Sequence, residues 1–251
     1  MGGVDGRVAL VTGGGRGIGL ATADLLASRG ARLMCVARSV DELTAAGHDF
    51  IATDLGTIEG CEQAVRETER RLGSVDILIC NHGIGSAHEH VVWEQDPEVW
   101  RESMRVNLDA PFYLSRLVLP GMIERRYGRV VYTSSTAGLV AEYAGSAYTT
   151  SKHGLLGLMR SVAQDAGQFG VTANAVLPGW VRTAMAERSA RYEANDNGIT
   201  TDEVWAERAS LYPPGRVVTP GEVAALIGFL ASEESSGVSG EAIRVALGSV
   251  A

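Results

Sequence analysis

The sequence predicts an α/β fold, a doubly wound parallel seven-stranded sheet with helices on both faces. Short apolar runs alternate along the chain with longer, helix-periodic stretches, which is typical of βαβ units. The apolar runs show no polar alternation, as expected for strands that are buried on both sides. The 251 residues contain no linker, repeat or low-complexity tract, so we expect a single domain over residues 1–251.

The expected elements follow one another in a regular order. Strands are expected at Val8–Val11, Leu33–Val36, His48–Ala52, Val75–Cys80, Val130–Tyr132, Val171–Leu177 and Glu241–Ala246. Helices are expected at Ile18–Ser28, Ile58–Leu72, Pro97–Arg126, Gly145–Phe169 and Glu222–Ala231. A polar, irregular stretch at Ala190–Pro214 interrupts this order, and we interpret residues 184–215 as an insertion that covers a site.

Composition and charge limit the class of partner. The 22 basic and 30 acidic residues give a net charge of −8, which argues against nucleic acid or an anionic membrane. No apolar run is long enough to cross a bilayer, and the N-terminus shows no signal-peptide pattern. Cys35, Cys61 and Cys80 form no C-x-x-C pair and are expected to be buried free thiols. We therefore expect a cytoplasmic protein.

A glycine-rich segment, Thr12-Gly-Gly-Gly-Arg-Gly-Ile-Gly19, joins the first strand to a helix. Missing side chains at such a turn let a pyrophosphate lie against backbone N–H groups at the helix N-terminus. The spacing differs from the common G-x-G-x-x-G pattern, and the Lys-Ser/Thr ending of an NTPase loop is absent. A glycine-rich turn without a ligand is the alternative. The segment predicts a Rossmann fold that binds a dinucleotide through Gly13, Gly15, Arg16, Gly17, Ile18 and Gly19.

The end of the second strand should decide which dinucleotide binds. An acid there holds the ribose 2′-hydroxyl of NAD, whereas an arginine accommodates the 2′-phosphate of NADP. Ala37 and Arg38 occupy this place, and Arg16 projects from the glycine loop, so two guanidiniums can fork a phosphate. NADPH is therefore predicted over NAD, unless both arginines are only solvated surface residues. Asp41 and Glu42 fit the first turn of a helix instead.

A set of polar residues follows the strands at the same edge of the sheet. Tyr148 and Lys152 share one face of a predicted helix, and Ser135 ends a strand thirteen residues before Tyr148. With these residues the chain resembles the short-chain dehydrogenase/reductase family from about Arg7 to Val245. The motifs that carry the resemblance are T-G-x-x-x-G-I-G at Thr12–Gly19, Asp54-Leu55, Asn81-His82-Gly83, Asn107, Ser135, Y-x-x-x-K at Tyr148 and Lys152, and P-G-x-x-x-T at Pro178, Gly179 and Thr183.

The resemblance implies a role for each catalytic residue. Tyr148 would be the general acid, because the Lys152 ammonium favours phenolate and lowers a pKa that is about 10 in a free phenol. Ser135, selected over Ser134 by its spacing from Tyr148, would donate a hydrogen bond to the substrate oxygen. Asn107 would hold a water or backbone group that relays protons to Lys152. The cofactor-binding residues implied beside the glycine loop and Arg38 are Asp54, Leu55, Asn81, Gly83, Tyr148, Lys152, Pro178, Gly179, Val181 and Thr183.

The resemblance also implies a homotetramer. The Pro97–Arg126 and Gly145–Phe169 helices would pair across one two-fold axis, and the Glu222–Val245 segment would pair across another. One departure concerns this interface and the C-terminal tail. Where family members commonly carry Asp-Gly-Gly after the last strand, this chain reads Ala246-Leu247-Gly248.

The substrate should be selected by the segments that flank the catalytic residues. The insertion looks like that of aromatic polyketide and β-ketoacyl ketoreductases, which predicts a 3-oxoacyl thioester of carrier protein or CoA, or a polyketide-type ketone. Tyr143, Trp180 and Met185 would line an apolar pocket, and Arg188 or Arg191 would meet a phosphopantetheine phosphate unless they are merely exposed.

The sequence is also compatible with other functions. One is an NAD-linked secondary-alcohol dehydrogenase, such as an enzyme that acts on 3-hydroxybutyrate. Another is a non-catalytic dinucleotide-binding regulator, which would need neither the serine, the tyrosine nor the lysine. His88, Glu89 and His90 suggest a metal site, but no further ligand follows at a zinc-like spacing, so no metal is expected.

Overall fold

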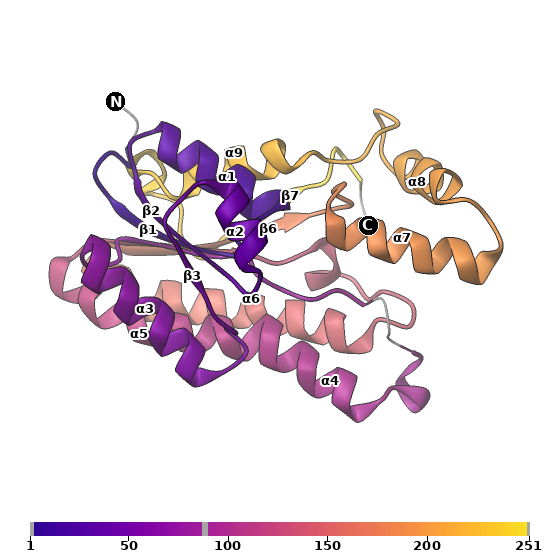
Figure 1. The fold of residues 1–251 in the computed structure, drawn as a ribbon, viewed down its shortest axis with the longest axis horizontal. Coiled ribbons are helices and arrows are strands. Elements are labelled where there is room, and N and C mark those ends of the chain that lie inside the picture. Colours follow the sequence, from indigo (N-terminus) through magenta and orange to yellow (C-terminus); the bar gives the residue numbers. More distant parts are fainter. Residues whose placement is uncertain (1–2, 87–89, 250–251) are drawn as a thin grey trace.

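The computed structural model describes residues 3–86 and 90–249 and shows one seven-stranded parallel sheet between two helical layers (Figure 1). The strands are β1 (Val8–Thr12), β2 (Arg32–Ala37), β3 (Phe50–Ala52), β4 (Ile77–Cys80), β5 (Gly128–Thr133), β6 (Val171–Pro178) and β7 (Ala242–Val245). Their order is β3-β2-β1-β4-β5-β6-β7. The predicted doubly wound parallel sheet is confirmed, and the order reverses between β1 and β4, where ligands bind in such sheets.

Helices cover both faces of the sheet. They are α1 (Gly17–Ser28), α2 (Val40–Ala46), α3 (Ile58–Leu72), α4 (Pro97–Met104), α5 (Ala110–Arg125), α6 (Ser146–Ala166), α7 (Ala184–Asn197), α8 (Thr201–Ser210) and α9 (Pro220–Leu230). Helices α1 and α9 pack together on one face, and α3, α5 and α6 lie on the other. Along β1, Leu10 faces one core while Ala9 and Val11 face the other. Both faces are therefore apolar, which explains the lack of polar alternation.

The expected long helix at Pro97–Arg126 is interrupted. A π-helical turn, Arg105–Asp109, separates α4 from α5 and carries Asn107. A π-turn inserts one residue into the helical repeat, and such turns are frequent at functional sites. Periodicity alone did not reveal it, because the apolar pattern continues on both sides of the turn.

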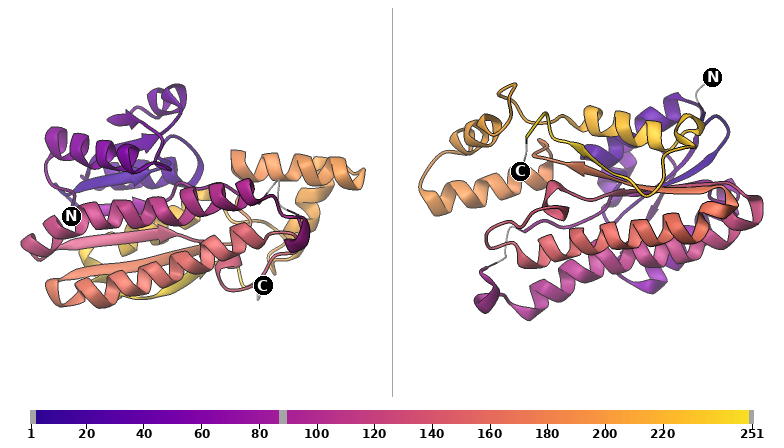
Figure 2. Two further views of the ribbon diagram at one scale, coloured as in Figure 1. Left: turned by 90° about the horizontal axis from the view of Figure 1, so that it is seen from below. Right: turned by 180° about the vertical axis from the view of Figure 1, so that it is seen from behind.

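The insertion is helical where the sequence predicted irregular structure. Helices α7 and α8 project beyond the end of the sheet (Figure 2). A capping box between Thr200 and Glu203 starts α8, and a small core forms around Ala190, Val204 and Trp205. The buried stripe of α7 consists of alanines only, so the segment is polar in composition although it is amphipathic in shape.

The cysteines agree with the sequence reading. Cys35, Cys61 and Cys80 are all buried and unpaired. Burial raises the pKa of Cys35 and that of Cys61 to about 12, so neither thiol ionises at neutral pH. Within residues 3–86 and 90–249, no helix has the length and apolar character needed to span a membrane.

Candidate active site

The glycine-rich turn lies at the carboxyl edge of β1. Gly13 and Gly17 have φ values of 66° and 56°, in the left-handed region that favours glycine. A Cβ at Gly19 would lie 2.0 Å from the Gly13 carbonyl oxygen, so α1 begins directly beneath the turn. Thr183 covers this turn from the segment after β6, since a Cβ at Gly17 would lie 3.2 Å from its Cγ2. The bare backbone at a helix N-terminus fits the diphosphate of a dinucleotide.

Thr12 ties the ends of β1 and β4 together at the point where the strand order reverses. Its hydroxyl donates to the Ile79 carbonyl at 3.0 Å and accepts the Asn81 N–H at 2.9 Å. The Asn81 side-chain amide donates to the Thr12 carbonyl at 3.3 Å. The His82 Nδ1 lies 2.8 Å from the same hydroxyl, and burial lowers the pKa of His82 to about 4. His82 is therefore neutral at physiological pH.

The Asp54 carboxylate accepts hydrogen bonds from Gly56 and Arg105, two residues that the sequence analysis did not single out. Its Oδ1 accepts the Gly56 N–H at 3.0 Å, and its Oδ2 accepts from Arg105 Nη1 at 3.3 Å. Burial raises the pKa of Asp54, but the Gly56 N–H and the Arg105 guanidinium outweigh it and hold the pKa below its usual value. Arg105 is itself oriented by Glu102, through contacts of 2.7 and 2.8 Å. The only feature of the sequence that could have drawn attention to Arg105 is its position two residues before Asn107.

The two arginines that the sequence predicts to hold a 2′-phosphate have different environments. Arg16 Nη1 lies 2.6 Å from Glu42 Oε1, so the Arg16 guanidinium forms an ion pair with the Glu42 carboxylate. Ser39 caps α2 by accepting the Glu42 N–H, which places Glu42 in the first turn as expected. A Cβ at Gly15 would lie 3.2 Å from the Glu42 Cβ, so this acid lies directly against the glycine loop. Arg38 is exposed, and its positive charge contributes to the lowered pKa of Asp54.

Lys152 is a buried cation on α6 and the only lysine in the sequence. Its side chain is 5% exposed, and its Nζ donates to the Thr133 carbonyl at 3.0 Å. Burial lowers the pKa of Lys152 to about 8. The Nζ lies 5.6 Å from the centroid of the Tyr148 ring, one turn earlier on α6. The expected common face of these two residues is present.

Asn107 connects the loop after β4 to α6. Its Oδ1 accepts the Ile84 N–H at 2.9 Å, and its Nδ2 donates to the Ile84 carbonyl at 3.0 Å and to Ser151 Oγ at 3.1 Å. The predicted backbone partner of Asn107 is thus the peptide backbone of Ile84. A Cβ at Gly83 would lie 3.0 Å from Asn107 Oδ1 and 3.6 Å from Lys152 Nζ, so these three residues converge.

Two adjacent serines at the end of β5 have different environments. Ser134 Oγ donates to the Lys152 carbonyl at 3.1 Å and so braces α6 against the sheet. Ser135 Oγ accepts the Ala137 N–H at 3.1 Å and donates to none of the described residues. Ser135 therefore keeps a hydroxyl hydrogen for a ligand, which agrees with its selection over Ser134.

The end of β6 and the start of the insertion lie beside this group. Pro178 is the last residue of β6, and the Gly179 N–H donates to the Val245 carbonyl at 3.1 Å. Val181 is buried and pairs with Val218 in an isolated bridge. Thr183 caps α7 by accepting the Ala186 N–H. Leu55 is buried below Asp54, and Ile18 packs in the core between α1 and α9.

The three predicted substrate residues have different outcomes. Met185 lies near the loop after β4, since a Cβ at Gly85 would lie 3.5 Å from its Sδ. Trp180 is stacked against Arg208, whose Cζ lies 3.6 Å from the ring centroid, so one ring face is covered. The Tyr143 side chain is 92% exposed, so none of the described residues encloses it in the apolar pocket that the sequence predicts. The chain turns into α6 directly after it, at Ala144, whose φ is 48°.

The remaining residues that the sequence singled out lie on the surface or outside the described residues. Arg188 and Arg191 are exposed on α7. Of the proposed metal ligands, His88 and Glu89 lie outside the described residues, and His90 is exposed. Among residues 3–86 and 90–249, no group of three or more His, Cys, Asp or Glu is placed to hold a metal ion.

Comparison with known proteins points to one family. A model of the short chain dehydrogenase family matches residues 7–194. The D-beta-hydroxybutyrate dehydrogenase of Cupriavidus necator is 36% identical over 249 residues, with 94% of this chain and 95% of that protein covered. The 3-oxoacyl-acyl-carrier-protein reductase of Vibrio cholerae is 33% identical over 249 residues, with 96% of each covered. A solved structure of actinorhodin polyketide ketoreductase with NADPH has a TM-score of 0.91 and 32% identity, over 99% of this chain and 98% of that one.

The sequence matches, the strand order and the residues gathered at the carboxyl edge agree with one another. The motif residues follow five strands, β1, β3, β4, β5 and β6, and lie along this edge although they are far apart in the sequence. The chain therefore belongs to the short-chain dehydrogenase/reductase family and is an NAD(P)-dependent oxidoreductase that acts on ketone or hydroxyl groups.

Proposed function

We propose that this protein is an NADPH-dependent ketoreductase whose substrate is a 3-oxoacyl thioester, linked to carrier protein or CoA, or a polyketide-type ketone. The observation that carries the chemistry is the buried Lys152 beside Tyr148, with the free hydroxyl hydrogen of Ser135 at the end of β5. The names of two similar proteins, a 3-oxoacyl reductase and a polyketide ketoreductase, support the substrate class.

Tyr148, Ser135 and Lys152 would each have a separate role in protonating the substrate carbonyl. When bound, the dinucleotide supplies the hydride that reduces the carbonyl carbon. Tyr148 donates its phenolic proton to the carbonyl oxygen and becomes a phenolate, while Ser135 donates a hydrogen bond to that oxygen. The Lys152 ammonium stabilises the phenolate through its positive charge. In the opposite direction the phenolate accepts the hydroxyl proton of an alcohol.

The glycine-rich turn and the α1 N-terminus would hold the diphosphate, with Thr183 closing over it. Asp54 would meet the adenine edge. Because Arg105 and the Gly56 N–H already hold both of its oxygens, the Asp54 carboxylate is fixed before a cofactor arrives. Asn107 would keep the loop after β4 in place against α6 through Ile84.

The preference for NADPH rests on residues at the end of β2. Ala37 presents no carboxylate to a 2′-phosphate, and Arg38 is exposed and available to bind it. Each charge-assisted contact contributes ~1–2 kcal/mol, which corresponds to about 5- to 30-fold in kcat/KM. The ion pair between Arg16 and Glu42 favours NAD(H), because the Glu42 carboxylate would repel a 2′-phosphate. The second candidate function is therefore an NAD(H)-linked alcohol dehydrogenase.

A panel of carbonyl substrates, each assayed with NADPH and NADH, tests this proposal. The panel contains 3-oxoacyl thioesters, polyketide-like cyclic ketones and acetoacetate, the ketone that corresponds to 3-hydroxybutyrate. We expect turnover of a 3-oxoacyl or polyketide-like ketone with NADPH favoured. Turnover of acetoacetate alone, with NADH favoured, would establish the alcohol dehydrogenase. Binding of cofactor without turnover of any ketone would indicate a regulator.

Two variants test the cofactor preference directly. The double variant Ala37→Asp with Arg38→Leu places a carboxylate opposite the phosphate and removes a guanidinium, so it should lose the preference for NADPH. Glu42→Gln tests the opposite change: it releases the Arg16 guanidinium from its carboxylate partner and should strengthen the preference for NADPH. Equal or better activity of the unmodified protein with NADH would show that the NADPH assignment is wrong.

A further inference from the structure

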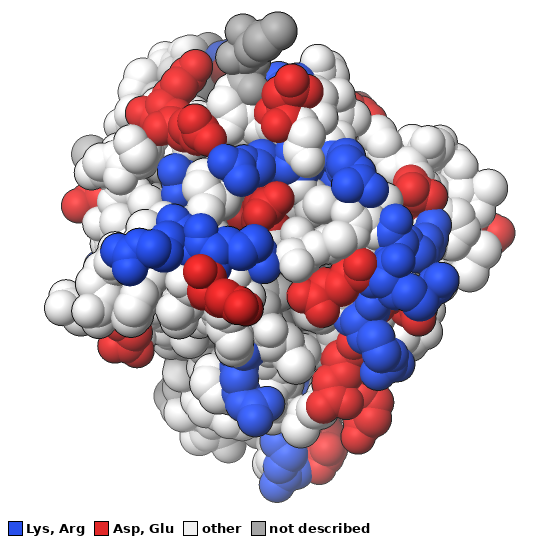
Figure 3. All heavy atoms as spheres, turned by 90° about the vertical axis from the view of Figure 1, so that its left-hand side faces the viewer, with Lys and Arg blue, Asp and Glu red and all other residues white. Residues whose placement is uncertain are grey.

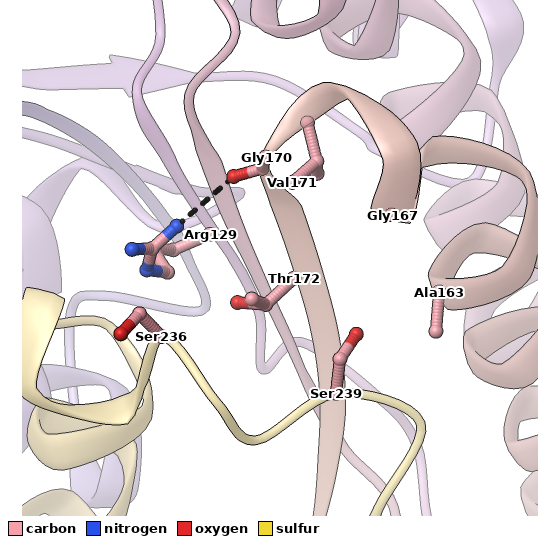
Figure 4. A pocket seen from close by; sticks show the side chains of 8 residues that line it. All are labelled: Arg129, Ala163, Gly167, Gly170, Val171, Thr172, Ser236 and Ser239. Atoms are coloured by element: carbon pink, nitrogen blue, oxygen red, sulfur yellow. Dashed lines mark hydrogen bonds between the residues drawn. The ribbon is translucent and has the colours of Figure 1, made fainter.

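A second cavity lies at the opposite edge of the sheet, where β5 and β6 begin (Figure 4). Its volume is about 240 Å³. This is more than the ~30 Å³ that one water occupies and less than the ~300–1,000 Å³ of pockets for drug-sized ligands. The residues that line it are Arg129, Ala163, Gly167, Gly170, Val171, Thr172, Ser236 and Ser239. The cavity therefore has room for a small group of a few heavy atoms.

Arg129 is a buried cation in the wall of this cavity. Its side chain is 4% exposed, and it forms no ion pair with any described carboxylate. Its Nε donates to the Ser232 carbonyl at 3.0 Å, and its Nη1 donates to the Gly128 and Gly170 carbonyls at 2.9 and 3.3 Å. Its Nη2 donates to none of the described residues. The Arg129 Cζ also lies 4.6 Å from the centroid of the Tyr127 ring, so Nη2 is the part of the guanidinium left to bind an anion.

Thr172 supplies a second, independent indication of a ligand. It is 7% exposed, and its buried hydroxyl has no hydrogen-bond partner among the described residues. In Figure 4 this hydroxyl points from β6 toward the side on which Arg129 and Ser236 lie. Ser239 Oγ accepts the Ala173 N–H at 3.3 Å, so its hydroxyl hydrogen is available to a ligand. Buried polar groups without partners are rare in folded proteins.

The surface around the cavity carries both basic and acidic side chains (Figure 3). Arginines stand at the starts of several strands, and basic side chains form bands across this side of the molecule (Figure 3). Arg7 pairs with Glu233, whereas Arg32 is exposed and Arg126 donates to the Gln168 carbonyl at 3.1 Å.

We propose that this cavity binds a small oxyanion, the chemical group shared by inorganic phosphate and simple carboxylates. Arg129 Nη2 is the charged donor, and the hydroxyls of Thr172, Ser239 and Ser236 are neutral donors. The site is separate from the dinucleotide site, because it opens at the amino ends of the strands rather than the carboxyl ends. This proposal does not rest on the identity of the ketone substrate.

Isothermal titration calorimetry with inorganic phosphate and with acetate, at constant ionic strength, tests the proposal. Because the glycine-rich turn is itself expected to bind phosphate, each titration is performed with and without saturating NADP⁺. We expect saturable binding of one or both anions that persists when NADP⁺ is present. The stronger ligand of the two identifies the kind of oxyanion. Binding that disappears on addition of NADP⁺ would place the anion at the dinucleotide site and overturn the proposal.

Thr172→Val removes the unpartnered hydroxyl while keeping the shape of the side chain. The dissociation constant should rise about tenfold, the scale of one hydrogen bond to a charged group. Ser239→Ala should weaken binding in the same direction and gives a second test if the valine variant folds poorly. Thr68→Val is the matched control, since Thr68 is a buried threonine on α3 whose hydroxyl donates to the Ala64 carbonyl. Unchanged affinity in both cavity variants, or no saturable binding at all, would show that the cavity holds only solvent.

Discussion

Lys152 offers a direct test of how burial shapes the active site. Its side chain is 5% exposed and has no carboxylate partner among the described residues, so desolvation lowers its pKa from 10.5 to about 8. A change of this size corresponds to about 3 kcal/mol of differential stability between the two protonation states. At pH 7 the residue is still about nine-tenths protonated, which is the form that stabilises a Tyr148 phenolate.

The single lysine makes the measurement simple. Protein labelled with ¹⁵N-lysine has one side-chain ammonium signal, and its chemical shift can be followed from pH 6 to pH 11. We expect a titration midpoint near pH 8. A midpoint at or above pH 10 would refute the argument, because it would show that Lys152 is solvated in the folded protein.

The same shift predicts how stability depends on pH. The folded pKa lies below the unfolded one, so between about pH 8 and pH 10.5 the unfolded state binds more protons and the free energy of unfolding rises with pH. Below pH 8 both states are protonated, and this dependence disappears. Urea unfolding of the protein and of Lys152→Met isolates the effect, since tyrosine ionisation is common to both. We expect a rise of about 3 kcal/mol in the difference between them.

Three further predictions concern catalysis, cofactor binding and assembly. Tyr148→Phe removes the proton donor and keeps the ring, so turnover should fall by about 10² or more with cofactor affinity nearly unchanged; retention of most of the turnover would show that Tyr148 is not the acid. Arg105→Gln removes the guanidinium that holds the Asp54 carboxylate, so KM for the cofactor should rise about tenfold while kcat stays constant. Arg105→Lys should recover part of this loss. A fall in kcat without a change in KM would contradict the positioning role of Arg105. We also expect a homotetramer, and Phe112→Asp, at a ring on α5 that is 47% exposed, should reduce the mass measured by light scattering. A monomer mass for the unmodified protein at micromolar concentration would exclude the tetramer.

Local rules explain why so much of the site could be read from residues. A turn such as Gly13–Gly19 needs glycine where φ is positive or where backbones touch, so its glycines are visible in sequence. Helical periodicity places Tyr148 and Lys152 on one face, and Ser135 lies at a strand end, but the resemblance to the family is what assigned them catalytic roles. The continuous apolar runs of the strands likewise predicted a sheet that is covered by helices on both faces.

Contacts between distant segments were not readable in this way. The Arg16–Glu42 and Arg105–Asp54 ion pairs join residues 26 and 51 positions apart, and many other charged residues were equally plausible partners by spacing. The π-helical turn at Asn107 leaves no mark in the apolar pattern, which continues through the residues on both sides of it. The alanine stripe of α7 is too weakly apolar to stand out in a polar segment.

The sequence by itself determined the fold class, the glycine-rich turn and the residue types at the carboxyl edge, because these depend on local backbone geometry and on periodic burial. The tertiary structure alone decided that Arg16 is paired, that Tyr143 is exposed and that Arg129 and Thr172 share one cavity. An unpaired buried charge or hydroxyl is defined by what surrounds it in space. Its free energy depends on the neighbours that folding brings to it and on the water that folding removes.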